Sequence, residues 1–294
     1  MRILRFFADD DAVHVGVRRG ATVLDLGPAP GLDAGAGGVR APLSVPLAPP
    51  IAERPLATLR LDAPIRGSRK LLALAGNYRS HVVESGFTPV GERETVTPQV
   101  FWKPPTAVNR PGGAIALRPN NVCLDWEIEL AVVIGRAATR VSTDEAMEAV
   151  FGYTAMNDIS ERRFNARVEP RTLRELDPFF DWLMGKWFDG SAPLGPEIVT
   201  KDEIPEPHDL RLRLWVNDEL MQDGHTSQMI FRIPETIAYI SSVVTLEPGD
   251  IIAMGTPDGV GAARGLSLKP GDRVRGEIEG IGVLDTLITA EAPR

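Results

Sequence analysis

Apolar residues along the chain fall mostly into short runs, a length typical of strands rather than helices. Turn residues close many of these runs, and Pro-Gly-Asp occurs twice, at residues 248–250 and 270–272, where it predicts tight turns that lead into strands. The strands expected in the main part of the chain are residues 70–74, 130–134, 210–216, 251–254 and 274–278. We therefore expect an α+β fold in which strands predominate.

Helices are predicted at two places only. Residues 144–150 and 234–243 have the best helical patterns, and the Ser-Thr-Asp-Glu sequence at 142–145 supplies residues that cap a helix N-terminus. No repeat with a period of 20–50 residues is present, which argues against a solenoid or propeller.

The N-terminal part of the chain differs from the rest. Residues 1–26 predict short strands, with a hairpin turn at residues 9–11 and a second turn at residues 18–20. Residues 27–69 are rich in glycine, proline and alanine, which argues against regular structure there. The prolines concerned are Pro28, Pro30, Pro42, Pro46, Pro49 and Pro50. We expect a small N-terminal domain with a connector over residues 1–69, and a main domain over residues 70–294.

Composition excludes several classes of protein. Of the 294 residues 43% are hydrophobic and 24% are charged, as in globular proteins that bury a core, and the net charge of −8 argues against nucleic-acid binding. Cys123 is the single cysteine, so an internal disulfide is excluded and a reducing compartment is expected. The sequence has neither an apolar run of membrane-spanning length nor a signal peptide, so we expect a cytoplasmic protein.

An acidic cluster is the strongest candidate site. In Asp125-Trp126-Glu127-Ile128-Glu129, strand alternation would place the three carboxylates on one face. Such a row is tolerated at a solvated sheet edge or around a cation, and oxygen ligands favour Mg²⁺, Mn²⁺ or Ca²⁺ over zinc. Asp158, which ends the apolar run 152–158, is either a third ligand or a turn residue.

Further candidates lie elsewhere in the chain. His81 and Glu84 are three residues apart, so one helical turn would let the carboxylate orient the imidazole as a general base, unless they are an exposed surface pair. Lys186 either binds a substrate carboxylate or lies at the surface. The glycine-rich segment 255–261 lets the backbone approach a ligand closely, but it has no nucleotide-binding spacing.

The other histidines and the cysteine are weaker candidates. His14 and His208 are expected at the surface, whereas His225 could line a site. Cys123 is interpreted as a buried thiol rather than a nucleophile, because no histidine follows at a suitable position.

The order of these motifs resembles the fumarylacetoacetate hydrolase family. The motifs are Asn-Tyr-x-x-His-x-x-Glu from residue 77, Glu-x-Glu-Leu-Ala-Val-Val-Ile-Gly from 127, Gly-Tyr-Thr-x-x-Asn-Asp from 152, Gly-Lys at 185–186, Val-Asn-x-Glu-x-x-Gln-x-x-x-Thr from 216, and Pro-Gly-Asp-x-Ile-x-x-Gly-Thr-Pro-x-Gly-Val-Gly from 248. The resemblance covers residues from about 70 to 287, and the N-terminal part resembles the small domain of many bacterial members.

The resemblance implies a fold and a set of site residues. The fold would be a mixed β-sandwich roll, in a homodimer that binds Mg²⁺ or another divalent cation. Glu127, Glu129 and Asp158 would be the metal ligands, and Asp125, a variable position in the family, is left out. The residues implied for catalysis are His81, Glu84, Lys186 and Arg162, and those implied for substrate binding are Thr256, Asn165 and Gln222.

Two departures affect the substrate side of the site. Arg163 and Asn165 stand where the family often has aspartate and glutamine, and the segment that leads to Lys186 is longer than in compact members. They change the substrate side of the site and leave the metal ligands intact.

The implied activity is hydrolysis of a carbon–carbon bond in an acylpyruvate or another 1,3-diketo acid, through a metal-bound enolate. The same metal site would also support oxaloacetate decarboxylation, or isomerisation or dehydration of a 2-oxo acid, and a non-catalytic binding protein is the more distant alternative. The expected partner is a small oxo-acid. A flavin or nicotinamide enzyme is disfavoured, because no glycine-rich dinucleotide motif follows a strand.

Overall fold

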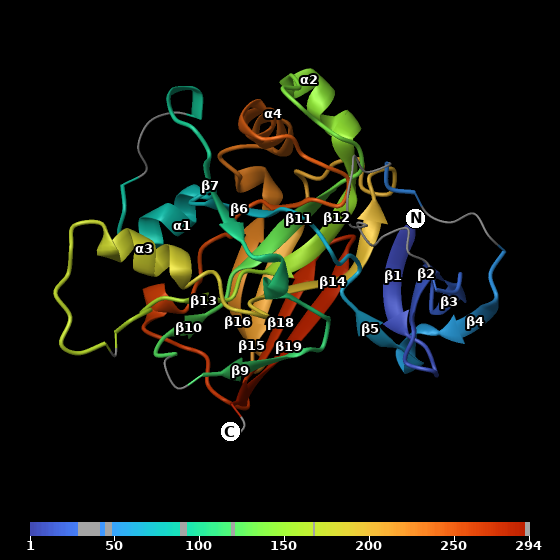
Figure 1. The fold of residues 1–294 in the computed structure, drawn as a ribbon, viewed down its shortest axis with the longest axis horizontal. Helices are drawn as coiled ribbons and strands as arrows, with labels where there is room; N and C mark the ends of the chain where they lie inside the picture. The colour runs from blue at the N-terminus through green and yellow to red at the C-terminus, as the bar shows by residue number, and fades with distance from the viewer. Residues whose placement is uncertain (29–41, 45–48, 89–92, 119–120, 167, 292–294) are drawn as a thin grey trace.

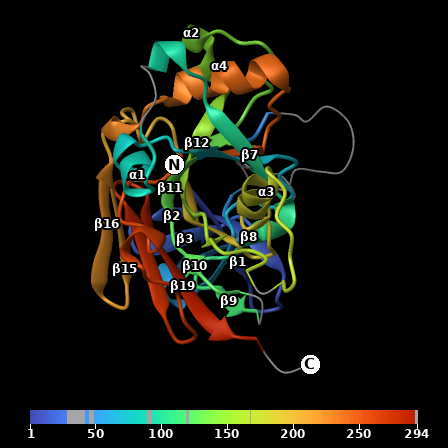
Figure 2. The same ribbon diagram turned by 90° about the vertical axis from the view of Figure 1, so that its left-hand side faces the viewer.

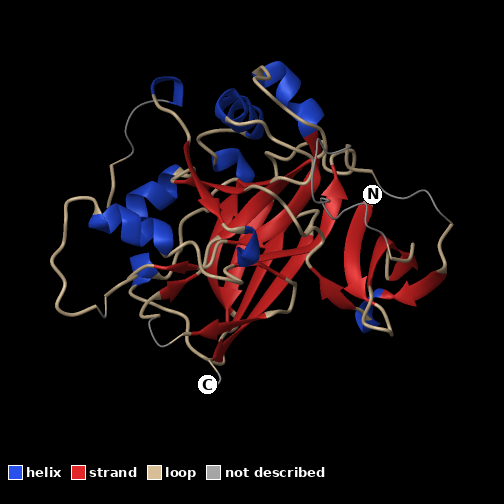
Figure 3. Cartoon of the chain, in the orientation of Figure 1, coloured by secondary structure: helices blue, strands red, loops and turns tan. Residues whose placement is uncertain are grey.

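The structure, a computed structural model, describes residues 1–28, 42–44, 49–88, 93–118, 121–166 and 168–291 (Figure 1). Strands form most of the regular structure, and the helices lie around them (Figure 3). The predicted α+β class with a predominance of strands is confirmed. No helix in the described part of the chain is long and apolar enough to cross a membrane, and the cytoplasmic location stays a prediction.

The N-terminal strands form a compact group at one side of the molecule (Figure 1). β1 (Arg2–Phe7), β2 (Val13–Arg19) and β3 (Thr22–Asp25) pair in succession. The first turn lies where the sequence predicted it, whereas the second lies at residues 20–21, because residues 18 and 19 still pair within β2. β1 also pairs with β14 (Ala192–Thr200), so these strands continue the large sheet of the main body. The domain boundary between residues 69 and 70 therefore stays a prediction.

The expectation that residues 27–69 lack regular structure was wrong in part. β4 (Ala52–Pro55), a 3-10 turn (Leu56–Thr58) and β5 (Arg60–Asp62) lie within this range. β4 pairs with β3 at the end of the sheet, where proline is tolerated because one strand edge needs no partner, and β5 pairs with β1. Pro30 and Pro46 lie outside the described residues.

Two larger sheets make up the main body. The strand order of the first is β4-β3-β2-β1-β14-β12-β11-β17-β6-β7, and that of the second is β16-β15-β18-β19-β9. The first sheet is mostly antiparallel, but β17 and β6 are parallel, and so are β14 and β8. Its remaining strands are β6 (Leu71–Ala75), β7 (Gln99–Lys103), β11 (Ile128–Ile134), β12 (Val150–Asn157) and β17 (Ile251–Ala253), and β8 (Val108–Asn109) pairs with β14. The second sheet has β9 (Ala114–Leu117), β15 (Arg211–Val216), β16 (Glu219–His225), β18 (Arg273–Ile278) and β19 (Gly282–Ala290).

The main core lies between these two sheets. Ile128, Leu130 and Val132 of β11 belong to one buried cluster with Leu212 and Leu214 of β15. Every residue of β11 is buried, which explains its almost continuous apolar sequence. Glu129 is the exception in that sequence, and it belongs to the site described below.

The helices lie in two groups (Figure 1). α2 (Thr143–Ala146), extended by a 3-10 turn (Met147–Ala149), and α4 (Ile233–Val243) are the two predicted helices, and Ser142 forms the expected cap. The second group, at the left of Figure 1, is α1 (Arg79–Glu84) and α3 (Asp177–Met184), which the hydrophobic pattern did not predict as helices. Both lie near the ends of the strands that carry the acidic cluster (Figure 2).

Two histidines differ from their predicted surface positions. His14 is buried, with Nδ1 2.8 Å from the Asp25 carboxylate. His208 is half-buried, and its Nε2 accepts a hydrogen bond of 3.1 Å from the backbone N–H of Ile233 at the start of α4. The hydrogen-bond partner of each imidazole is distant in the sequence, so no local sequence pattern indicates these contacts.

Candidate functional site

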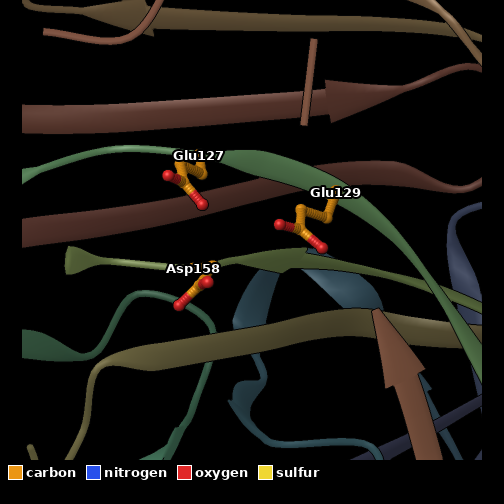
Figure 4. A group of neighbouring side chains, drawn as sticks. All are labelled: Glu127, Glu129 and Asp158. Atoms are coloured by element: carbon orange, nitrogen blue, oxygen red, sulfur yellow. The ribbon is translucent and has the colours of Figure 1, made fainter. Parts of the chain in front are cut away.

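Glu127, Glu129 and Asp158 converge at one end of two paired strands (Figure 4). Glu127 directly precedes β11 and Glu129 lies within it, so strand alternation gives both the same face. Asp158 directly follows β12, and its backbone N–H donates to the Glu127 carbonyl at 2.9 Å. All three are buried, and one oxygen from each lies within 4.8 Å of the others.

Asp125 does not join this cluster, because the strand breaks between β10 (Leu124–Asp125) and β11. Its carboxylate accepts hydrogen bonds from the backbone N–H groups of Gly261, at 2.6 Å, and Trp126, at 2.8 Å. The expectation that residues 125, 127 and 129 form one row therefore holds only for the two glutamates. Asp125 instead attaches the loop after β17 to the site.

Three cationic side chains surround the acidic cluster. Lys186 Nζ donates to Glu127 Oε2 at 2.7 Å and to Asp158 Oδ2 at 2.8 Å. Arg162 donates to Asp125 Oδ2 at 2.8 Å and also pairs with Glu127. Lys186 is only 3% exposed, so the surface interpretation of this lysine is excluded.

Lys103, the third cation, was missed by the sequence analysis. It is the last residue of β7, and its fully buried Nζ donates to Asp158 Oδ1 at 2.6 Å. Strand alternation offered a signal, because Lys103 shares a face with the buried Phe101. A lysine two residues from a core residue in the same strand points to the same face, so it is a candidate for a buried charge.

The electrostatics leave one carboxylate without a counter-ion. Burial raises the pKa of Glu127, but Arg162 and Lys186 reverse this effect and hold its pKa well below the usual range. Burial, Asp158 and Glu127 together raise the pKa of Glu129 well above the usual range. Glu129 accepts a hydrogen bond of 2.8 Å from Gly255 and has no cationic partner among the residues that the structure describes.

These residues fit a divalent cation. Four buried carboxylates face three cationic side chains, and the carboxylate without a salt bridge belongs to the cluster whose oxygens could share one ion. An all-oxygen donor set is the kind that Mg²⁺, Mn²⁺ and Ca²⁺ prefer.

The predicted dyad is formed on α1. His81 Nδ1 and Glu84 Oε1 lie 2.8 Å apart, and Glu84 Oε2 accepts a 2.7 Å hydrogen bond from the backbone N–H of Gly259. A residue with a side chain cannot replace Gly259 without strain, since φ is +101° and a Cβ would lie 2.1 Å from the Met221 carbonyl oxygen. His81 is among the groups that lower the pKa of Glu127, so the dyad lies within electrostatic reach of the acidic cluster.

Thr256 and Gln222 have partners within the protein. The Thr256 hydroxyl donates to the Ile128 carbonyl at 2.9 Å and accepts from Gln222 Nε2 at 2.8 Å. Gln222 Oε1 accepts from the Ile128 N–H at 3.0 Å, and both side chains are buried. Their hydrogen bonds connect the start of β11 with the loop after β17. The predicted contact of these two side chains with substrate stays a prediction.

The remaining candidates are Asn165, His225 and Cys123. Asn165 donates to Asp181 of α3 at 2.8 Å, so its predicted role with substrate stays a prediction. His225 Nδ1 lies 2.7 Å from the Ser227 hydroxyl, in a local cap. Cys123 is half-buried rather than buried as predicted. Its partial burial raises the pKa of the thiol, which agrees with its interpretation as unreactive.

Comparison with known proteins identifies the class to which this fold and site belong. The model of the fumarylacetoacetate (FAA) hydrolase C-terminal domain matches residues 70–289. The chain belongs to the fumarylacetoacetate hydrolase family, whose members are enzymes that include carbon–carbon bond hydrolases and isomerases.

Individual relatives have several activities. A mitochondrial oxaloacetate tautomerase of Homo sapiens is 38% identical over 232 residues, which cover 78% of this chain and 69% of that protein. A 2,4-didehydro-3-deoxy-L-rhamnonate hydrolase of Sphingomonas is 38% identical over 226 residues, 76% of this chain and 74% of that one. The solved structure of a maleylpyruvate hydrolase from Sphingobium, in complex with manganese(II) and pyruvate, has a TM-score of 0.72 at 27% identity and covers 99% of this chain and 100% of that one.

Proposed function

We propose that this protein is a metal-dependent hydrolase that cleaves a carbon–carbon bond in an acylpyruvate or a related 1,3-diketo acid. The observation that carries the proposal is the joint presence of the three converging carboxylates and the His81–Glu84 pair. The similarity to a maleylpyruvate hydrolase whose structure contains manganese and pyruvate supports it.

The chain's own residues have distinct proposed tasks. Glu127, Glu129 and Asp158 would hold Mg²⁺ or Mn²⁺, which when bound supplies a Lewis acid for the carboxylate and 2-oxo oxygens of the substrate. His81 Nε2, with the ring oriented through Nδ1 by Glu84, takes a proton from the water that attacks the distal carbonyl. Lys186 and Arg162 stabilise the negative charge that develops as the bond breaks.

Oxaloacetate chemistry is the second candidate, because a relative that is 38% identical is an oxaloacetate tautomerase. The two candidates can be separated by steady-state assays on acetylpyruvate, fumarylpyruvate and oxaloacetate, each with Mg²⁺ or Mn²⁺ and again with EDTA. We expect EDTA-sensitive cleavage of an acylpyruvate. Turnover of oxaloacetate alone would favour the second candidate, and activity that EDTA leaves unchanged would exclude both.

Replacing the proposed base tests the hydrolytic step. His81→Ala should lower kcat for hydrolysis by about 10²–10⁴-fold, the usual contribution of a general base, and leave Mn²⁺ affinity near that of the wild type. His225→Ala is the matched control, since the imidazole of His225 contacts Ser227 in a local cap and the exposed Asp209. Full turnover by the His81→Ala variant would reject the assigned base.

We also propose that the protein is a homodimer. Large apolar side chains are exposed on α3, just after it, and at β7, the last strand of the large sheet. They are Phe179, Phe180, Met184, Trp102 and Trp187. An exposed aromatic group of this kind is typical of an interface. Light scattering after gel filtration should give twice the chain mass of 31.9 kDa, and a monomer would exclude the proposal.

A further inference from the structure

Lys103 joins two parts of the site that are far apart in the sequence. Its Nζ donates both to Asp158 Oδ1, at 2.6 Å, and to the backbone carbonyl of Lys186. These partners are 55 and 83 residues away along the chain. Lys103 lies on the last strand of the large sheet and Asp158 follows β12, so the side chain bridges elements that are not neighbours in the strand order.

The two lysines hold Asp158 from both sides. Lys186 Nζ donates to Asp158 Oδ2 at 2.8 Å, and Lys103 Nζ donates to Asp158 Oδ1. Rotation of the Asp158 carboxylate would therefore break a charge-assisted hydrogen bond on either side. Lys103 also fixes the backbone from which the Lys186 side chain projects, so it determines where both functional groups lie.

We propose that Lys103 is a positioning residue that adapts this site to an anionic substrate, by fixing Asp158 and Lys186 and by adding one positive charge. The inference rests on the proposed metal centre and gives Lys103 no contact with the reacting atoms. Lys103 is fully buried among the charged residues that it positions.

Removal of Lys103 should affect a cation and an anion differently. For the metal ion, the loss of a fixed ligand lowers affinity and the loss of a nearby positive charge raises it, so the two effects oppose each other. For an anionic ligand, the loss of the Lys103 charge and the displacement of Lys186 both lower the affinity. Affinity for the anion should therefore fall much further than affinity for the ion.

Lys103→Met tests this difference, and Lys70→Met is the matched control. Lys70 is also a buried lysine between two carboxylates, with Nζ 2.8 Å from Asp250 and 2.9 Å from Glu247. Calorimetry would measure the binding of Mn²⁺, and then of oxalate to the Mn²⁺-loaded protein. For Lys103→Met we expect a loss of oxalate affinity and of kcat of about tenfold or more, as for other residues that orient metal ligands, with a smaller change for Mn²⁺. Lys70→Met should leave both affinities unchanged.

The outcomes separate this inference from the proposed function. A wild-type protein that fails to bind Mn²⁺ would overturn the metal centre itself and this inference with it. Mn²⁺ binding by the wild type, with equal losses of oxalate affinity in the two variants, would overturn the role of Lys103 alone. If Lys103→Met does not fold, the wild-type crystal structure with Mn²⁺ and oxalate decides, because Lys103 Nζ must then remain within hydrogen-bond distance of both Asp158 and the Lys186 carbonyl.

Discussion

Two buried carboxylates, one in the N-terminal strands and one in the main body, have nearly the same burial but different partners. Asp25 accepts a hydrogen bond of 2.8 Å from the Gly27 N–H, and His14 Nδ1 and Arg54 Nε each lie 2.8 Å from its oxygens. Glu129 accepts a similar bond from Gly255 and has no cationic partner in the described part of the chain.

The pKa values of the two groups move in opposite directions. Burial raises the pKa of Asp25, but Arg54, Gly27 and His14 outweigh it, so the net shift is downward. The pKa of Glu129 is raised by burial and by its acidic neighbours. A buried carboxylate with a complete set of partners stays charged and stabilises the fold, whereas one without a cation either binds a proton or pairs with an ion from outside the chain. This difference separates the ionic cluster of the N-terminal strands from the candidate metal site.

The largest effect should come from Glu129→Gln, which keeps the acceptor for Gly255 and removes the charge. Affinity for Mn²⁺ should fall on the order of 10³-fold, because one of three anionic ligands becomes neutral. Metal-free stability should be unchanged or higher, since repulsion with Glu127 and Asp158 is relieved. Calorimetry with Mn²⁺ and thermal unfolding in EDTA measure the two quantities, and a marked loss of metal-free stability would contradict the comparison.

Binding of the ion should produce the next effect. With free Mn²⁺ at roughly 100 times Kd, the wild type should gain about 2.7 kcal/mol in free energy of unfolding. The free energy of unfolding of Glu129→Gln should rise by almost nothing at the same Mn²⁺ concentration. Denaturant unfolding with Mn²⁺ and with EDTA would show the difference, and equal stabilisation of both proteins would place the ion elsewhere.

Asp25→Asn should have the opposite profile to Glu129→Gln. We expect a loss of about 2 kcal/mol in free energy of unfolding, less than for a fully buried ion pair because Arg54 is partly exposed. Affinity for Mn²⁺ should not change. A weaker ion affinity in this variant would show that the two clusters are coupled, and the comparison would fail.

The smallest effect should be a change in pH dependence. Because folding lowers the pKa of Asp25, its contribution to stability is present above the unfolded value of 3.8 and is lost as pH falls through the lower folded value. For Glu129, whose pKa is raised, metal-free stability is lost as pH rises from the unfolded value of 4.5 through the folded one. Unfolding in EDTA across the acid range should therefore show a shallower decline at low pH for Asp25→Asn, and the same slope as wild type would contradict this.

Much of the site could be predicted because its residues occur in ordered motifs. Glu127 and Glu129 alternate on one strand, and His81 and Glu84 share a helical turn, so short-range periodicity was enough to pair them. For Lys103, short-range periodicity offered only the signal of a buried charge on the face of Phe101. Its partners could not be predicted, because they are distant in the sequence and only the packing of the sheets brings them together. Asp125 was misjudged, because strand alternation carries no information about where a strand breaks.

The fold was predicted best where one pattern dominated. α2 and α4 have start signals that fit their packing, whereas α3 has Pro178 and two adjacent phenylalanines, which look more like a loop or strand. β4 and β5 were missed, because the prolines around them outweighed the short strand signals. Their pairing with β3 and β1 is a tertiary effect that overrides local preference.

The hydrogen bond between Glu84 and Gly259 has a consequence for when the enzyme is competent. α1 has six residues, too few for a helix to be stable by itself in water, so it persists through attachments such as this one. If α1 unwinds, His81 loses its orientation and Gly259 loses its acceptor in the same event. The orientation of the proposed base and the hydrogen bonding of the loop that contains Gly259 thus depend on the same short helix.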